Sequence, residues 1–124
     1  MRWIVDGNNV FGSRPDGWWN DRDAAARRLA QAVAEWCRTH ADEVALVFDA
    51  PVAAGTFELG GGNLTIVESR RRGRDAADDR IVELVDAIED DEPWVVTSDR
   101  GLRARLPERC QVMGAGRFLS ILEA

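Results

Sequence analysis

Aspartates follow three separate apolar segments of the sequence, at the point where each segment ends. Asp6 closes "RWIVD", Asp49 closes "EVALVFD" and Asp99 closes "PWVVTSD". If these segments are parallel strands of one sheet, their carboxyl ends meet at a single edge, which is where open α/β sheets bind ligands. We therefore expect the three carboxylates to lie close together.

A fourth acidic position lies in an amphipathic segment, residues 73–91. Asp78 precedes Ile81 by three residues and Val85 by seven, so it shares the helix face that is expected to pack on the sheet. We expect its side chain to point toward the sheet rather than to solvent. Asp79 either belongs to the same site or is a solvent-exposed acid that suits the first turn of a helix.

Carboxylates gathered in one cleft repel one another. At about 4 Å, two like charges cost about 4 kcal/mol at an effective dielectric constant near 20. Mg²⁺ or Mn²⁺ would relieve this repulsion, because hard divalent cations prefer oxygen ligands. Such ions can stabilise the attacking and leaving oxygens of phosphodiester cleavage. For each single aspartate the alternative is a structural role, since an Asp after a strand often forms a turn or caps a helix.

Polar residues beside the aspartates suit such a site. Gly7 lets the backbone turn closely, and Asn8 or Asn9 can orient a carboxylate or a water molecule without adding charge. Thr97 and Ser98 add hydroxyl groups at the same edge. The single histidine, His40, is expected at a helix end, which favours metal-assisted over histidine-based chemistry.

The pattern along the chain indicates an α/β fold. The strand segments are continuous apolar runs that mostly alternate with helical segments, which predicts a mostly parallel sheet of about five strands covered on both faces. One domain over residues 1–124 is expected from the length. Residues 7–20 and 52–63 are predicted to be loops. The predicted strands are residues 2–6, 43–50, 64–69, 93–99 and 110–114, and the predicted helices are residues 21–40, 73–91, 101–106 and 117–124.

Positive charge is unevenly distributed. The net charge of −6 argues against a protein that binds nucleic acid over its whole surface, and all 16 basic residues are arginine. Arginine binds phosphate in a bidentate manner, although a run of arginines can also be a solvated loop. Trp18 and Trp19 could stack on unpaired bases or pack in the core or a dimer interface. The candidate RNA-binding arginines, all expected near the acidic edge, are Arg14, Arg70, Arg71, Arg72, Arg74, Arg100 and Arg103.

Other features point to a cytoplasmic protein. Cys37 and Cys110 match no metal-binding or redox spacing, which favours buried free thiols in a reducing compartment. No apolar run reaches the length of a membrane span. The N-terminus does not have the pattern of a signal peptide.

Four segments in this order, "IVDGNNV", "LVFDAP", "GRDAADDRIVELV" and "VVTSDRGL", resemble the NYN branch of PIN-like ribonucleases, and within it the bacterial YacP-like group. The resemblance runs from Trp3 to about Leu102, with "MGAGRFL" as a matching end. It implies a single PIN-like, Rossmann-like domain and a metal-dependent endoribonuclease that cleaves RNA with Mg²⁺ or Mn²⁺. By this resemblance the metal ligands are Asp6, Asp78 and Asp99, the catalytic set adds Asp79, and the supporting residues are Asn9 and Asp49. Ser98 is added to the supporting residues because its hydroxyl lies at the same edge.

The sequence departs from the family pattern in two places. Many PIN-like nucleases carry a further acid shortly after the residue that matches Asp99, whereas here none precedes Glu108. The loop between the second and third predicted strands is also short for the YacP-like group. A second hypothesis is therefore a catalytically weak or inactive RNA-binding module of the same fold. A phosphotransfer domain is disfavoured, because the chain has no lysine and position 8 is Asn.

RNA, in single-stranded or loop regions, is the expected partner. Association with the ribosome or with mRNA, and a homodimer formed through Trp18 and Trp19, are further expectations.

Overall fold

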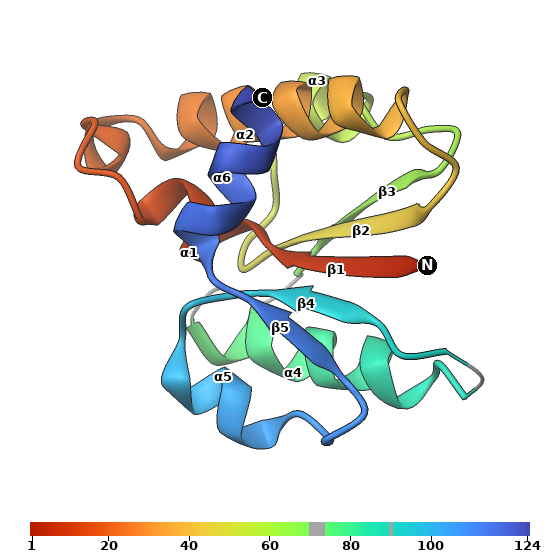
Figure 1. The fold of residues 1–124 in the computed structure, drawn as a ribbon. Coiled ribbons are helices and arrows are strands. Elements are labelled where there is room, and N and C mark those ends of the chain that lie inside the picture. Colours follow the sequence, from red (N-terminus) through yellow and green to blue (C-terminus); the bar gives the residue numbers. More distant parts are fainter. Residues whose placement is uncertain (70–73, 90) are drawn as a thin grey trace.

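A parallel sheet forms the centre of the molecule. In the part of the chain that the computed structural model describes, residues 1–69, 74–89 and 91–124, five strands pair in the order β3-β2-β1-β4-β5 (Figure 1). Every strand pairs in parallel with its neighbours, which confirms the predicted architecture. The strands are β1 (Arg2–Asp6), β2 (Glu43–Phe48), β3 (Leu64–Glu68), β4 (Trp94–Val96) and β5 (Gln111–Met113).

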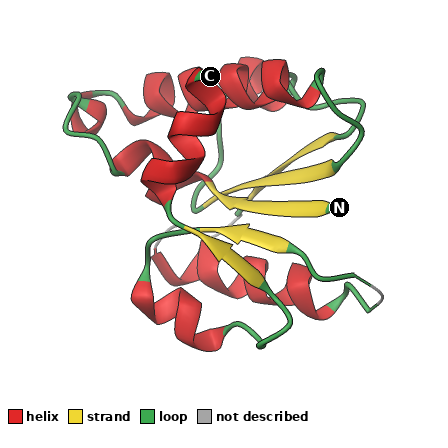
Figure 2. Ribbon diagram, in the orientation of Figure 1, coloured by secondary structure: helices red, strands yellow, loops and turns green. Residues whose placement is uncertain are grey.

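Helices cover both faces of this sheet (Figure 2). This explains why consecutive residues in the middle of the strands are apolar: Val5 of β1 packs into the core on one face and Ile4 into the core on the other. One face carries α1 (Gly7–Gly12), the 3₁₀ helix η1 (Trp18–Asn20), α2 (Arg22–Cys37), α3 (Ala54–Phe57) and α6 (Ala115–Glu123), and the other carries α4 (Arg74–Asp86) and α5 (Arg100–Arg105).

Two cores hold the layers together. On the face of α2 and α6, the ring of Trp3 stacks on Trp94 with centroids 5.6 Å apart and meets the edge of Trp36 at 5.1 Å. On the face of α4, Ile81 and Val85 are fully buried against the sheet. The predicted inward face of residues 73–91 is therefore confirmed, and this face fixes the direction of Asp78.

The helix α1 corrects the prediction of a loop directly after β1. Glycine and asparagine are poor helix formers, so the local sequence "GNNVFG" gives little sign of a helix. Tertiary packing overrides this preference, because Val10 and Phe11 are buried and α1 contacts both α2 and α6. Part of the other predicted loop is also helical, since Ala54–Phe57 form one turn, α3.

The termini of the predicted elements shift by a few residues. Asp21 caps α2, with its Oδ1 accepting a hydrogen bond from the Ala24 N–H at 3.0 Å. Cys37 and Cys110 are both free thiols.

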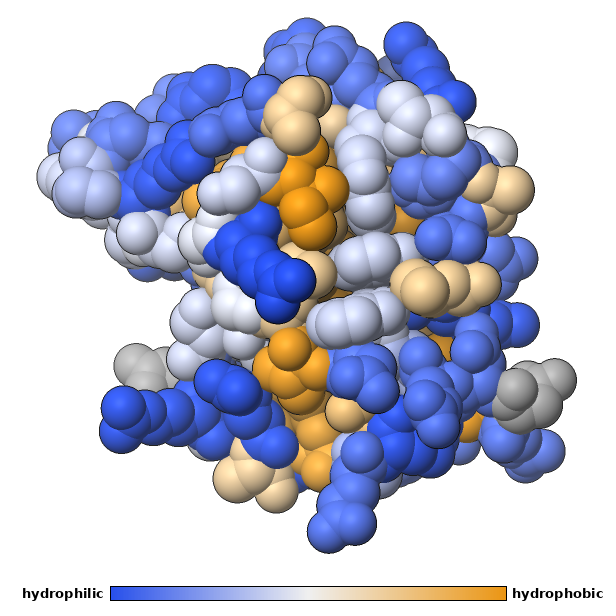
Figure 3. Space-filling model, viewed as in Figure 1, coloured by the Kyte–Doolittle hydropathy of each residue, from blue (hydrophilic) through white to orange (hydrophobic). Residues whose placement is uncertain are grey.

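Hydrophilic side chains cover most of the surface visible in Figure 3, with small apolar patches between them. Within the described ranges, no helix has the length and apolar character needed to cross a bilayer.

Candidate active site

A pocket of about 620 Å³ lies at the carboxyl ends of the central strands, and acidic side chains from separate elements line it. Asp6 is the last residue of β1, Asp49 follows β2, Asp78 lies in α4, and Asp99 precedes α5. The structure thus brings together four aspartates that are far apart in the sequence, at the sheet edge where the sequence placed them.

Asp6 is the most buried of these carboxylates, with 5% of the residue exposed. The Thr97 hydroxyl donates a hydrogen bond to its Oδ2 at 2.9 Å. Burial nevertheless raises the pKa of Asp6 to about 6, and the negative charges of Asp78 and Asp99 act in the same direction. No cationic group pairs with Asp6 among the described residues. The pocket therefore holds a carboxylate that the fold hydrogen-bonds but does not neutralise.

Asp78 is a second buried carboxylate, and its negative charge is only partly compensated. It is 8% exposed, and its pKa is raised by burial and then by the charge of Asp99. The guanidinium of Arg105 offsets only part of this effect. Asp6, Asp78 and Asp99 therefore influence one another electrostatically across one pocket.

Asp99 has a structural role as well. Its Oδ1 accepts hydrogen bonds from the N–H groups of Gly101 at 2.8 Å and Leu102 at 3.1 Å, which caps α5. Its own N–H donates to the Thr97 hydroxyl at 3.1 Å. Both capping bonds use Oδ1, so in the described part of the chain Oδ2 is not engaged by the helix cap. The structural and the functional interpretation of Asp99 are compatible.

The two asparagines after β1 connect the ends of neighbouring strands. Asn8 accepts a hydrogen bond from the backbone N–H of Asp49 at 2.8 Å, and Asn9 accepts one from the N–H of Ser98 at 2.8 Å. The Ser98 hydroxyl in turn accepts the Ala115 N–H at 2.9 Å. These contacts fix the backbone beside the pocket. The sequence analysis predicted that Asn8 or Asn9 orients a carboxylate or a water molecule. In the structure, the side-chain oxygen of each accepts a hydrogen bond from a backbone N–H group instead.

Gly7 is required by close packing at this point. A Cβ at this position would lie 2.8 Å from the Phe48 ring and 2.9 Å from the Val47 carbonyl oxygen. Any side chain would therefore push β1 away from β2. Because Asp6 and Asn8 flank Gly7, this close approach places both of their side chains at the strand ends.

Several predicted site residues lie elsewhere. Asp79 is not in the acidic pocket: its Oδ1 pairs with Arg105 at 2.8 Å, and it lines a separate hollow beside β3. Arg14 pairs with Glu123 and lines another pocket. Arg100 and Arg103 are exposed on α5. Arg70, Arg71 and Arg72 lie outside the described residues, and Arg74 begins α4.

One cationic residue of the pocket was missed by the sequence analysis. Arg22, in the first turn of α2, lines the pocket together with Trp18 and Phe11. Its charge lowers the pKa of Asp49, against the larger raising effect of burial. A signal existed, since a helix that follows β1 in a parallel sheet begins at the carboxyl edge, and Asp21 marks that beginning.

The donor set fits a hard divalent cation that keeps part of its hydration. Carboxylate oxygens predominate, and the buried charge of Asp6 has no cationic partner in the described residues, which is the imbalance that Mg²⁺ or Mn²⁺ relieves. Within residues 1–69, 74–89 and 91–124, no three acidic, histidine or cysteine side chains are gathered into a preformed metal-binding group. The roles of Asp6, Asp78 and Asp99 as ligands stay predictions.

The five-stranded parallel sheet with acidic residues at its carboxyl edge defines a single Rossmann-like α/β domain. The family model of the YacP-like NYN domain matches residues 3–122, and the chain therefore belongs to this family, as the sequence motifs predicted. NYN domains are generally nucleases, and the fold is consistent with an RNA nuclease.

Solved structures with the same fold include Rae1 (YacP) from Bacillus subtilis, at 23% sequence identity and a TM-score of 0.73. A mutant of that protein gives 24% identity and a TM-score of 0.77. In both comparisons the alignment covers 99% of this chain and 74% of the other chain. At this level of identity the likeness shows a shared fold. A search of curated proteins found no match.

Proposed function

We propose that this chain is a metal-dependent endoribonuclease that hydrolyses RNA phosphodiester bonds in the acidic pocket. One observation carries the proposal: buried and partly buried carboxylates from four separate segments of the chain line one pocket, and Asp6 among them has a pKa of about 6. Carboxyl groups with strongly shifted pKa values occur more often at functional sites than elsewhere in proteins. Membership of a family of nucleases supports the same conclusion.

In this proposal, Asp6, Asp78 and Asp99 hold Mg²⁺ or Mn²⁺. A divalent cation at this position supplies charge neutralisation for the phosphate and makes a water molecule more acidic. The chain's own contribution is positioning: Thr97 orients Asp6 through the 2.9 Å hydrogen bond, and Asn9 fixes the backbone that carries Asp99. Attack by water on phosphorus leaves a 5′-phosphate and a 3′-hydroxyl.

Asp49, Asp79 and Ser98 receive different roles in this proposal. Asp49 lines the pocket on the side of Arg22 and supports the site without being required as a ligand. Ser98 acts through its hydrogen bond to the start of α6. Asp79, which pairs with Arg105 outside the pocket, is not retained as a catalytic residue.

A second candidate function is an RNA-binding module of the same fold with weak or absent catalysis. Two observations favour it: the capping of α5 by Asp99, and the absence of a preformed three-residue metal group in the described part of the chain. For both candidates the partner is RNA in single-stranded or loop regions. Ribosome or mRNA association, a homodimer and a cytoplasmic location stay predictions.

Incubation with mixed cellular RNA separates the two candidates. Wild type and Asp99→Asn are compared with Mn²⁺ and with EDTA, and new 5′ ends are mapped. Asparagine keeps an oxygen that can cap α5 while removing the charge, so a folding defect is not expected. We expect wild type to produce new 5′-phosphate ends only with Mn²⁺, and Asp99→Asn to produce none.

Two other results would contradict the nuclease proposal. RNA binding without cleavage under every condition would favour the binding module. Products with 2′,3′-cyclic phosphate would show attack by the ribose hydroxyl rather than by water. Asp79→Asn is the control, because it also removes one carboxylate charge, but from a residue that lies outside the pocket.

A further inference from the structure

One wall of the acidic pocket is aromatic and cationic rather than acidic. Phe11, Trp18 and Arg22 form this wall next to Asp49. The ring of Trp18 lies 5.8 Å from that of Phe11 and 5.8 Å from that of Trp19, both edge-on, and Trp19 is 56% exposed. Coordination of a cation by the aspartates makes no use of this wall.

Arg22 is available for a ligand. Its guanidinium lies over the Trp18 ring, 5.2 Å from the centroid, and it forms no ion pair within the described residues. Arg14 and Arg105 differ in that each pairs with an acidic side chain. An exposed cation–π contact is weak, whereas a guanidinium–phosphate contact is charge-assisted and bidentate. A phosphate can therefore draw Arg22 away from the ring.

The charges of the pocket favour this wall as the phosphate-binding side. Asp6, Asp78 and Asp99 repel a phosphate unless a cation is bound between them, while Arg22 attracts one without any cation. Movement of the guanidinium onto a phosphate would also uncover the ring of Trp18. A base can reach that ring only after leaving a duplex stack, which selects unpaired nucleotides.

We propose that Trp18 and Arg22 form a nucleotide subsite beside the acidic residues, in which Trp18 stacks on an unpaired base and Arg22 binds a neighbouring phosphate. The proposal rests on the proposed function for the choice of RNA as the ligand. It deepens that function by assigning the substrate class, single-stranded RNA, to two named side chains.

Binding without cleavage tests the subsite. A fluorescein-labelled single-stranded RNA of about ten nucleotides is titrated in EDTA, and fluorescence anisotropy is followed over a series of salt concentrations. We expect Arg22→Ala to raise the Kd by about tenfold. The slope of log K against log salt should become shallower by about 0.7, the value for one phosphate contact on a single strand. Arg27→Ala, an exposed arginine on the same helix that does not line the pocket, should change neither.

Trp18 is tested separately because its loss should leave the salt slope unchanged. We expect Trp18→Leu to raise the Kd for the single strand by about 5- to 150-fold, and Trp18→Phe to recover most of this loss. Binding to a blunt-ended RNA duplex, which has no unpaired base, should change less. Trp18 packs against Phe11, so thermal unfolding checks each variant; Arg22 is exposed, and its variant stays informative if Trp18→Leu does not fold.

The subsite is overturned if Arg22→Ala binds with the Kd and salt slope of Arg27→Ala, or if wild type binds a blunt-ended RNA duplex as tightly as the single strand. These outcomes differ from failure of the nuclease proposal. Binding that depends on Arg22, followed by no cleavage when Mn²⁺ is added, overturns the nuclease and supports the subsite. Cleavage together with binding that is independent of Arg22 overturns the subsite alone.

Discussion

Acidic side chains have opposite electrostatic environments at the two ends of the sheet. At the carboxyl end, Asp6 and Asp78 are nearly buried and their pKa values are raised. At the amino end, Asp42 lies 3.4 Å from the N-terminal amine and accepts a hydrogen bond from the Trp3 indole at 3.4 Å. Glu43, beside Asp42, pairs with Arg2 at 3.6 Å.

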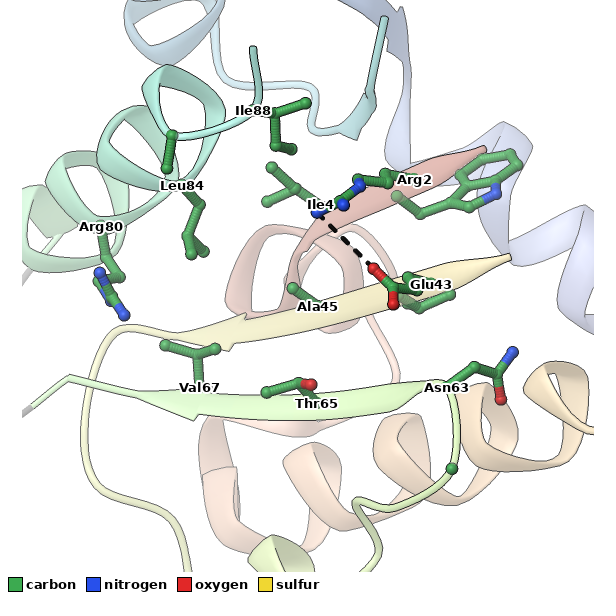
Figure 4. Close-up of a pocket in the computed structure, with 14 residues that line it drawn as sticks. Arg2, Ile4, Glu43, Ala45, Asn63, Thr65, Val67, Arg80, Leu84 and Ile88 are labelled. Carbon is green, nitrogen blue, oxygen red and sulfur yellow. Dashed lines mark ion pairs between the residues drawn. The ribbon is translucent and has the colours of Figure 1, made fainter. Parts of the chain in front are cut away.

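The pockets at the two ends differ accordingly. A second pocket, of about 340 Å³, lies between α4 and the strands β1–β3. Apolar side chains such as Ile4, Leu84 and Ile88 predominate in it (Figure 4). Its acidic residue, Glu43, already faces Arg2, as the dashed line in Figure 4 marks. An acidic side chain that pairs with a cationic one is compatible with a structural role. A buried carboxylate without such a partner destabilises the folded state and indicates a ligand-binding site.

The largest expected effect comes from comparing two adjacent residues of α4. Asp78 lines the acidic pocket, whereas Asp79 pairs with Arg105 outside it. We expect Asp78→Asn to lower kcat/KM for RNA cleavage by about 100-fold or more, as for loss of a group that stabilises transition-state charge. Asp79→Asn should stay within about twofold of wild type, since an exposed ion pair contributes only about 0–1 kcal/mol to stability. Steady-state cleavage of one labelled RNA measures both.

The neighbouring variants serve as each other's control, because they remove the same charge from consecutive positions of one helix. Equal losses in both would show that the site includes the side of α4 that faces Arg105. An acidic residue with a cationic partner would then matter for cleavage as much as one without such a partner. The comparison of the two ends of the sheet depends on the opposite outcome.

The second effect concerns stability and its dependence on pH. The pKa of Asp6 is about 6 in the folded protein and 3.8 ordinarily, so the folded state holds this proton more tightly than the unfolded chain. The contribution of Asp6 to stability is therefore fully present below pH 3.8 and is lost as the pH rises through about 6. The loss at neutral pH is about 3 kcal/mol. Urea unfolding of wild type between acidic and neutral pH, without divalent cations, should show this decline.

Asp6→Asn should lack that pH dependence, because its side chain stays uncharged. We expect the variant to unfold with a free energy about 1–3 kcal/mol higher than wild type at neutral pH, and to be inactive. Adding Mn²⁺ should stabilise wild type and not the variant. Parallel stability curves for the two proteins would show that Asp6 does not carry the charge imbalance assigned to the carboxyl end.

The sequence predicted the acidic edge because its signals are local. Apolar runs mark the strands, and the residue that follows each run marks the edge, so Asp6, Asp49 and Asp99 could be placed without knowing any contact. The spacing of Asp78 from Ile81 and Val85 gave its direction in the same way. The sheet and the grouping of the aspartates were accessible from these patterns.

Features that depend on tertiary packing were not accessible. The helix α1 forms from residues of low helix propensity because Val10 and Phe11 are buried. The exclusion of Asp79 depends on Arg105, which lies on a different helix, α5. In each case the deciding partner is distant in the sequence, and no local pattern reports it.

The smallest expected effect lies at the amino end, and its sign is opposite to that of Asp6→Asn. Asp42→Asn keeps an oxygen for the Trp3 indole and removes only the charge that faces the N-terminal amine. We expect a loss of about 0–1 kcal/mol in the free energy of unfolding, which becomes smaller in high salt because the pair is screened. RNA cleavage should be unchanged, since Asp42 does not line the acidic pocket.

Glu43→Gln is the matched control, because it removes the charge of a second paired acid at the same end. If Asp42→Asn stabilised the protein as Asp6→Asn is expected to do, acidic charge would be unfavourable at both ends, and the pairing of charges would not distinguish a structural carboxylate from a functional one.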